Sequence, residues 1–146
     1  MTEQQYYANQ WLSRMFDVMG EIEQLEIRKE KILSSMSGVG KYDTNTGVFG
    51  GSDDNPTESK NIEYATLSQK VEEKSRLLQK ENVRTLEVIE KVEDAKIRGM
   101  LISRYLNRKS WVQIGKDYHY EKSRANDYRI MSLKAVFEFI PKEVIV

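Results

Sequence analysis

The chain of 146 residues contains no cysteine, two prolines and a single histidine. Without cysteine there is neither a disulfide framework nor a thiolate zinc site. Because His119 is the only histidine, we expect no histidine-based acid–base chemistry, no catalytic residues, no bound metal and no cofactor. The many carboxylates lie on charged helix flanks, which are typical of solvated surface rather than of a buried acid–base pair. The sequence therefore predicts a protein that is not an enzyme.

Long apolar runs are also missing. No stretch approaches the roughly 18 consecutive apolar residues that a membrane-spanning helix needs, and the N-terminus has no basic segment followed by an apolar core. We therefore expect neither membrane insertion nor secretion, and a cytoplasmic location.

The net charge is zero, but the charge is unevenly spread along the chain. Residues 1–92 carry 12 basic and 16 acidic side chains, a net charge of −4, whereas residues 93–146 carry 11 and 7, a net charge of +4. Between Lys96 and Lys134 the excess sharpens to 10 basic against 3 acidic residues. A basic C-terminal unit would attract a polyanion at one end of the chain, although a solvated basic helix face has the same composition.

Apolar residues in the N-terminal part recur at alternating spacings of three and four, which predicts a coiled-coil helix over residues 1–36. Only Lys29 interrupts this seam of Ala8, Trp11, Met15, Val18, Ile22, Leu25, Lys29, Ile32 and Met36. The same spacing also suits an amphipathic helix packed into its own domain.

Residues 37–60 contain five of the eight glycines and one of the two prolines, and they predict a flexible loop. A second long helix is expected over residues 61–92, where apolar residues keep helical spacing among many charges. Two long helices joined by a loop can pair within one chain or between subunits, and the sequence leaves both open.

Shorter helices follow in residues 93–146, where we expect a three-helix helix-turn-helix unit at about residues 94–139 in an all-α fold. Ser110 is a good N-cap for a short helix, on which Gly115 would let the next helix approach closely. A turn at about His119 and Tyr120 precedes a longer basic helix, in which we expect Ala125, Tyr128, Leu133 and Val136 to point inward. Short helix, tight turn and longer basic helix form the two-helix unit that reads DNA.

The expected contacts with double-stranded DNA lie on the second helix of this motif and at the start of the first. Arginine suits the O6 and N7 atoms of guanine and asparagine the N6 and N7 atoms of adenine, whereas lysine and serine bind phosphates. Basic side chains and free amides at the first helix start would clamp the DNA backbone. The predicted DNA-binding residues are Arg108, Lys109, Ser110, Lys122, Ser123, Arg124, Asn126 and Arg129.

The run RYLNRKSWVQIGKDYHYEKSRANDYRIMSLKAV resembles a segment of small phage and prophage transcriptional regulators of the ArpU and RinA kind, which is similar to region four of sigma factors. The matching positions are Arg104, Tyr105, Leu106, Trp111, Ile114, Gly115 and Tyr120. Two positions depart from that pattern, because His119 stands where glycine is frequent and Ala125 where valine or isoleucine is expected. The resemblance covers about fifty residues and implies a regulator of phage late genes, such as packaging and lysis genes, in a bacterial host cell.

We therefore expect a sequence-specific transcription regulator that forms homo-oligomers, with a dimer favoured, through its N-terminal helices. Two half-sites would add discrimination to the few base contacts of one reading helix. One alternative is a DNA-recognition subunit of the packaging machinery, similar to a small terminase, which forms rings. The other is a helical adaptor that binds RNA polymerase and no DNA.

Overall fold

The computed structural model describes the backbone of residues 1–46 and 56–142, and the side chains of residues 1–36 and 57–142. Every regular element in this part of the chain is a helix, so the predicted all-α fold is confirmed there. The elements are α1 (Glu3–Leu12), α2 (Phe16–Thr46), α3 (Pro56–Glu90), α4 (Ala95–Leu101), the π-helical segment η2 (Ile102–Leu106), α5 (Trp111–Asp117) and α6 (Lys122–Phe137). Within the described residues, no helix combines the length and the apolar character needed to span a membrane.

The chain divides into two compact units. Residues Asp17–Leu78 form one, which we call the hairpin unit. Residues Met1–Phe16 and Gln79–Val146 form the other, the terminal unit, which therefore contains both ends of the chain. Helix α3 contributes to both units, since the division falls after Leu78.

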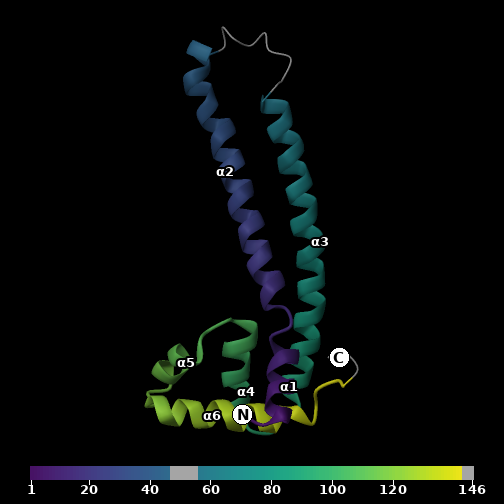
Figure 1. Ribbon diagram of the computed structural model, residues 1–146, viewed down its shortest axis with the longest axis vertical. Coiled ribbons are helices and arrows are strands. Elements are labelled where there is room, and N and C mark those ends of the chain that lie inside the picture. The colour runs from purple at the N-terminus through teal and green to yellow at the C-terminus, as the bar shows by residue number, and fades with distance from the viewer. Residues whose placement is uncertain (47–55, 143–146) are drawn as a thin grey trace. The chain divides into compact units, whose positions relative to one another are not determined.

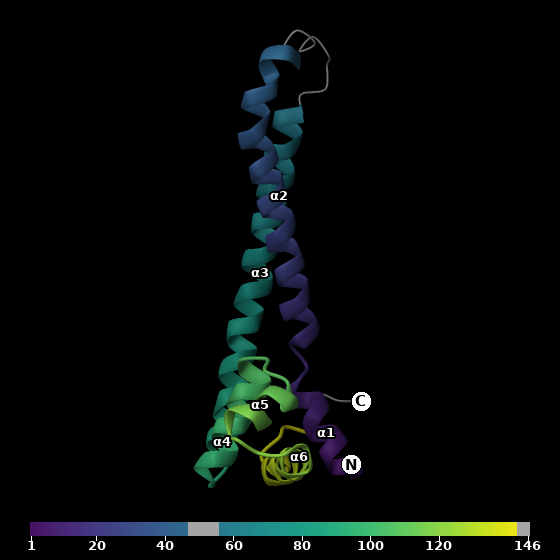
Figure 2. The same ribbon diagram turned by 90° about the vertical axis from the view of Figure 1, so that its left-hand side faces the viewer.

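In the hairpin unit, α2 and α3 lie side by side and antiparallel (Figures 1 and 2). Arg28 Nε lies 3.0 Å from Glu63 Oε2, and Lys74 Nζ lies 3.0 Å from Glu21 Oε1, so the start of α2 faces the later part of α3. Exposed pairs of this kind contribute only about 0–1 kcal/mol each, and they act chiefly on register. Buried apolar residues between the helices are Met19, Ile32 and Val71. The two long helices thus pair within one chain.

The loop predicted over residues 37–60 is wrong at both ends, because α2 continues to Thr46 and α3 begins at Pro56. Gly38 and Gly40 each cost about 1 kcal/mol in a helix, but adding residues to an existing helix is far easier than starting one. Pro56 occupies the first position of α3, where its missing N–H and fixed φ do no harm. The remainder of the predicted loop, residues 47–55, lies outside the described residues.

The single helix predicted over residues 1–36 is also wrong, because it breaks between Leu12 and Phe16. The Ser13 hydroxyl donates to the Asn9 carbonyl at 2.7 Å, and the Phe16 N–H donates to the Ser13 carbonyl at 3.0 Å. The residues of the predicted seam are therefore divided between the two units of the chain. Its first residues, Ala8 and Trp11, belong to the core of the terminal unit.

That core joins α1, the end of α3, α4, η2 and α6, and α1 lies beside α6 (Figures 1 and 2). Its buried residues are Ala8, Trp11, Leu12, Val88, Ile89, Val92, Ile97, Leu101, Tyr105, Leu133, Val136 and Ile140. The predicted domain of residues 93–146 is therefore too short, because residues 1–16 and 79–92 complete it.

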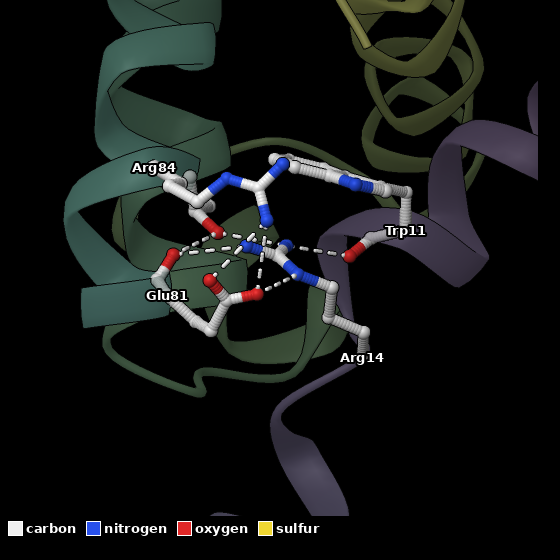
Figure 3. Close-up of polar contacts among 5 residues, drawn as sticks. Trp11, Arg14, Glu81 and Arg84 are labelled. Carbon is white, nitrogen blue, oxygen red and sulfur yellow. Dashed lines mark hydrogen bonds and ion pairs between the residues drawn. The ribbon is translucent and has the colours of Figure 1, made fainter. Parts of the chain in front are cut away.

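An arginine fastens α1 to α3 in this unit. Figure 3 shows the Arg14 guanidinium over the indole of Trp11, 3.7 Å from the ring centroid. Arg14 also donates to the Glu81 carbonyl at 2.9 Å and to Thr85 Oγ1 at 3.0 Å, and its Nε lies 3.4 Å from Glu81 Oε1. Burial lowers the pKa of Arg14 and the Glu81 carboxylate opposes this shift, so the ion pair offsets part of the desolvation.

We predict that Trp11→Ala lowers the free energy of unfolding of the terminal unit by about 3–5 kcal/mol, as expected for a fully buried large aromatic residue. The matched control is Trp111→Ala. The Trp111 side chain is partly exposed, so its loss should cost clearly less. Each variant keeps one tryptophan, whose fluorescence reports urea unfolding. Equal losses in the two variants would contradict the assignment of Trp11 as the central core residue.

A second prediction concerns Tyr105, whose hydroxyl donates to Asn9 Oδ1 at 2.6 Å. Burial raises the pKa of Tyr105 to about 12 from its ordinary 10.0. The folded state therefore holds this proton more tightly than the unfolded state, and stability should fall as the pH rises from 10 to 12, by about 3 kcal/mol in all. Denaturant unfolding across this range checks the loss. Tyr105→Phe should show a smaller loss of stability over the same range, and an unchanged loss would contradict the prediction.

Candidate nucleic-acid interface

The predicted brace and turn of the helix-turn-helix are present. Ser110 caps α5 by accepting the Gln113 N–H at 3.1 Å, as expected from the sequence. After Asp117 the chain turns through His119, which has a φ of 59°, and the Tyr120 N–H donates to the Gly115 carbonyl at 2.8 Å. Histidine thus adopts the left-handed conformation for which glycine is the commonest choice. The predicted reading helix, α6, then begins at Lys122.

The two helices of the motif touch at Gly115 and Ala125. A Cβ added to Gly115 would lie 2.9 Å from the Ala125 Cβ, closer than real Cβ atoms come. Both residues are buried, so α5 and α6 approach as closely as their backbones allow at this point. The expectation that Gly115 permits a close approach is confirmed.

An open groove lies between α5 and α6, with a volume of about 510 Å³. Its wall on α5 is mainly apolar and includes Val112, whose side chain is 62% exposed. Its wall on α6 carries polar and basic groups. The lining residues are Trp111, Val112, Gly115, Lys116, Tyr120, Lys122, Ala125, Asn126 and Arg129.

Three tyrosines form a stack at the start of α6, which we call the tyrosine ladder (Tyr118, Tyr120 and Tyr128). The Tyr120 and Tyr128 rings are parallel within 2° and 5.0 Å apart, and the Tyr118 ring lies 6.0 Å from that of Tyr120. Arg124 lies 4.8 Å from the centre of the Tyr120 ring, and Lys96 Nζ donates to the Tyr120 hydroxyl at 2.7 Å. This hydrogen bond raises the pKa of Lys96 and lowers that of Tyr120, so it favours the cationic lysine.

The residues predicted to read DNA divide between the α5–α6 groove and the tyrosine ladder. Lys122 and Asn126 are exposed and line the groove, and Ser123 is also exposed. Arg124 lies over the tyrosine ladder, because a shift of two residues turns a side chain about 200° around a helix. Arg129 lines the groove but is not on the outward face as expected. Its side chain is partly buried, and its Nε has no hydrogen-bond partner among the described residues.

The predicted backbone clamp at the start of α5 is weaker than expected. Lys109 Nζ lies 2.9 Å from Asp117 Oδ2, so part of its charge is already compensated, and this contact lowers the pKa of Asp117. Arg108 has a φ of 57° and lies 6.0 Å from the centre of the Phe16 ring. The Ser110 hydroxyl is occupied as the helix cap. These three residues are therefore largely engaged in the fold.

Sequence reasoning missed Lys96, Lys116 and the tyrosine ladder. Lys116 follows Gly115 on the brace helix, so its position could have been inferred from helical spacing. Lys96 belongs to α4 and meets the start of α6 only through the fold. The short repeat of tyrosines at positions 118, 120 and 128 gave no regular period.

Among the described residues, no group of three or more histidine, aspartate or glutamate side chains is placed to hold a metal ion. Comparison of the chain with protein-family models, with curated proteins and with solved structures finds no match.

We predict that Gly115→Ala destabilises the terminal unit by about 1–3 kcal/mol, because the added methyl group overlaps Ala125 and forces α5 and α6 apart. Gly20→Ala in α2 is the matched control, since no atom lies within 4 Å of the added Cβ. It should instead stabilise its helix by about 0.5–1 kcal/mol. Thermal unfolding followed by circular dichroism compares the two, and a harmless Gly115→Ala would contradict the close contact.

Proposed function

We propose that the protein is a sequence-specific, double-stranded DNA-binding transcription regulator. The observation that carries this proposal is the exposed first half of α6, which follows a helix-turn-helix turn and has basic or amide side chains on two sides. The major groove of DNA, about 12 Å wide, admits one such helix. The helix behind it, α5, is braced by the contact between Gly115 and Ala125.

Asn126 is the strongest candidate for a base contact. It is exposed, it lies one turn after Lys122, and no hydrogen bond to another described residue occupies its amide. Asparagine can make two hydrogen bonds to adenine, and such a pair discriminates by about 1–3 kcal/mol against other bases. Lys122, at the first position of α6, suits a phosphate or the edge of guanine.

The distribution of charge supports the terminal unit as the one that binds DNA, which is a polyanion. The terminal unit carries 15 basic and 11 acidic residues, whereas residues 17–78 carry 8 and 12. A polyanion is therefore attracted to the unit that contains α6 and repelled from the other.

We further propose that the protein forms a homodimer through its hairpin units. Two helices alone do not enclose their seam, and Val18, Ile22 and Leu25 of the predicted seam are only half-buried. The same unit exposes the large apolar side chains Ile27, Leu33, Ile62 and Leu77. Packing a second hairpin against the first would form a four-helix bundle and cover part of this apolar surface.

The biological setting is proposed from the resemblance described above. It favours a regulator of phage late genes that acts at a promoter in the cytoplasm of a bacterial host, with RNA polymerase as a further partner. A packaging subunit that recognises DNA is the alternative within the same DNA-binding class.

Selection from a random duplex library tests DNA recognition with the full-length chain. Wild type should enrich one sequence, and Asn126→Ala should bind that sequence about 5- to 150-fold more weakly while binding scrambled duplex as before, which corresponds to a lost base contact of about 1–3 kcal/mol. Lys134→Gln is the matched control, because this exposed lysine lies in the last turn of the same helix.

Absence of duplex binding by wild type at low salt would refute the proposal and would favour an adaptor that binds protein alone. Light scattering of the same samples measures the number of subunits. A dimer is expected, whereas a ring of about eight or more subunits would favour the packaging alternative.

A further inference from the structure

Lys96 and Arg124 come from different helices but converge on the tyrosine ladder. Lys96 Nζ lies 5.5 Å from the centre of the Tyr120 ring and 5.6 Å from that of Tyr128. The Arg124 guanidinium lies 4.8 Å and 6.0 Å from the same two rings. The ladder therefore holds two cations close together, and both side chains are exposed.

No carboxylate of the described residues forms an ion pair with either cation, and the Asp94 carboxylate beside Lys96 accepts the backbone N–H groups of Lys96 and Ile97 as the cap of α4. The positive charge of Arg124 acts on Lys96 as a repulsion. Aromatic faces attract cations without cancelling their charge. The pair thus remains available to an anion, in contrast to Lys109, which is paired with Asp117.

The position of Arg124 on α6, relative to the groove between α5 and α6, decides which part of the DNA it can reach. In α6, Arg124 lies two positions after Lys122 and two positions before Asn126. Because a shift of two positions turns a side chain about 200° around a helix, Arg124 lies on the far side of α6 from both. A helix with its side chains is about 10–12 Å across, close to the width of the major groove. If α6 enters the major groove of DNA with its N-terminal end first, side chains on both sides of its first turns come close to the DNA.

We propose that Lys96 and Arg124 form a second phosphate clamp, which binds the DNA backbone on the side of α6 away from the α5–α6 groove. This inference rests on the proposed DNA-binding function and deepens it. It adds Lys96 to the interface and gives Arg124 a phosphate rather than a guanine as its partner. Phosphate contacts carry no sequence information, so this clamp positions α6 and leaves base recognition to the groove side.

The salt dependence of binding tests the clamp. For each phosphate contact that is lost, the slope of log affinity against log salt concentration should become shallower by about 0.9. Lys96→Gln and Arg124→Gln should each show this change with the selected duplex and with scrambled duplex, so the ratio of the two affinities stays as in wild type. Asn126→Ala should do the reverse, changing the ratio and leaving the slope.

Lys134→Gln is again the matched control, and it should keep the wild-type slope. Because Lys96 and Arg124 are exposed, circular dichroism melts should show the two variants to be folded. Wild-type slopes in both variants would overturn the clamp, as would a change of preferred sequence in Arg124→Gln. Failure of wild type to bind any duplex would instead overturn the proposed function itself.

Discussion

The packing of Trp11 is the interaction on which the rest of the terminal unit depends. Its indole is fully buried in a core built from both ends of the chain, and Arg14 covers it on the side of α3. The Tyr7 hydroxyl adds a bond to the Pro141 carbonyl at 3.0 Å. Because α6 packs on α1, the predicted reading helix is supported by residues from the opposite end of the chain. The predicted helix-turn-helix gains in this way apolar contacts from α1 and from the end of α3.

Local signals in the sequence predicted the local structure well. Ser110 caps α5, His119 takes the left-handed turn and Gly115 lets α6 approach, because each depends on neighbours a few residues away. The break after Leu12 could not be predicted in the same way. The seam keeps its spacing through the break, and the decisive partner of Arg14, Glu81, is 67 residues away in the chain. Periodicity reports that a face is apolar and does not report which element covers it.

The same distinction explains the mixed result for the candidate interface. Helical geometry alone separates Arg124 from Lys122 and Asn126, so their division could have been predicted from the reading helix itself. The compensation of Lys109 by Asp117 could also have been suspected, since both flank α5. Lys96 could not, because it reaches the tyrosine ladder only after α4 has packed near the start of α6. Candidate site residues on one helix are accessible to sequence reasoning, whereas those contributed by another helix require the fold.

His119 and Ala125 are the two departures from the pattern of the resembling regulators, and both affect how α5 and α6 meet at Gly115. The left-handed His119 brings the Tyr120 N–H to the Gly115 carbonyl, and Ala125 meets Gly115 one turn into α6. The small alanine at position 125 accompanies this close approach. The turn and the contact together fix how α6 is rotated against α5. That rotation decides which side chains of α6 face the groove and which face the tyrosine ladder. The geometry of both sides of the proposed interface therefore depends on the small buried residues Gly115 and Ala125 and on the left-handed His119.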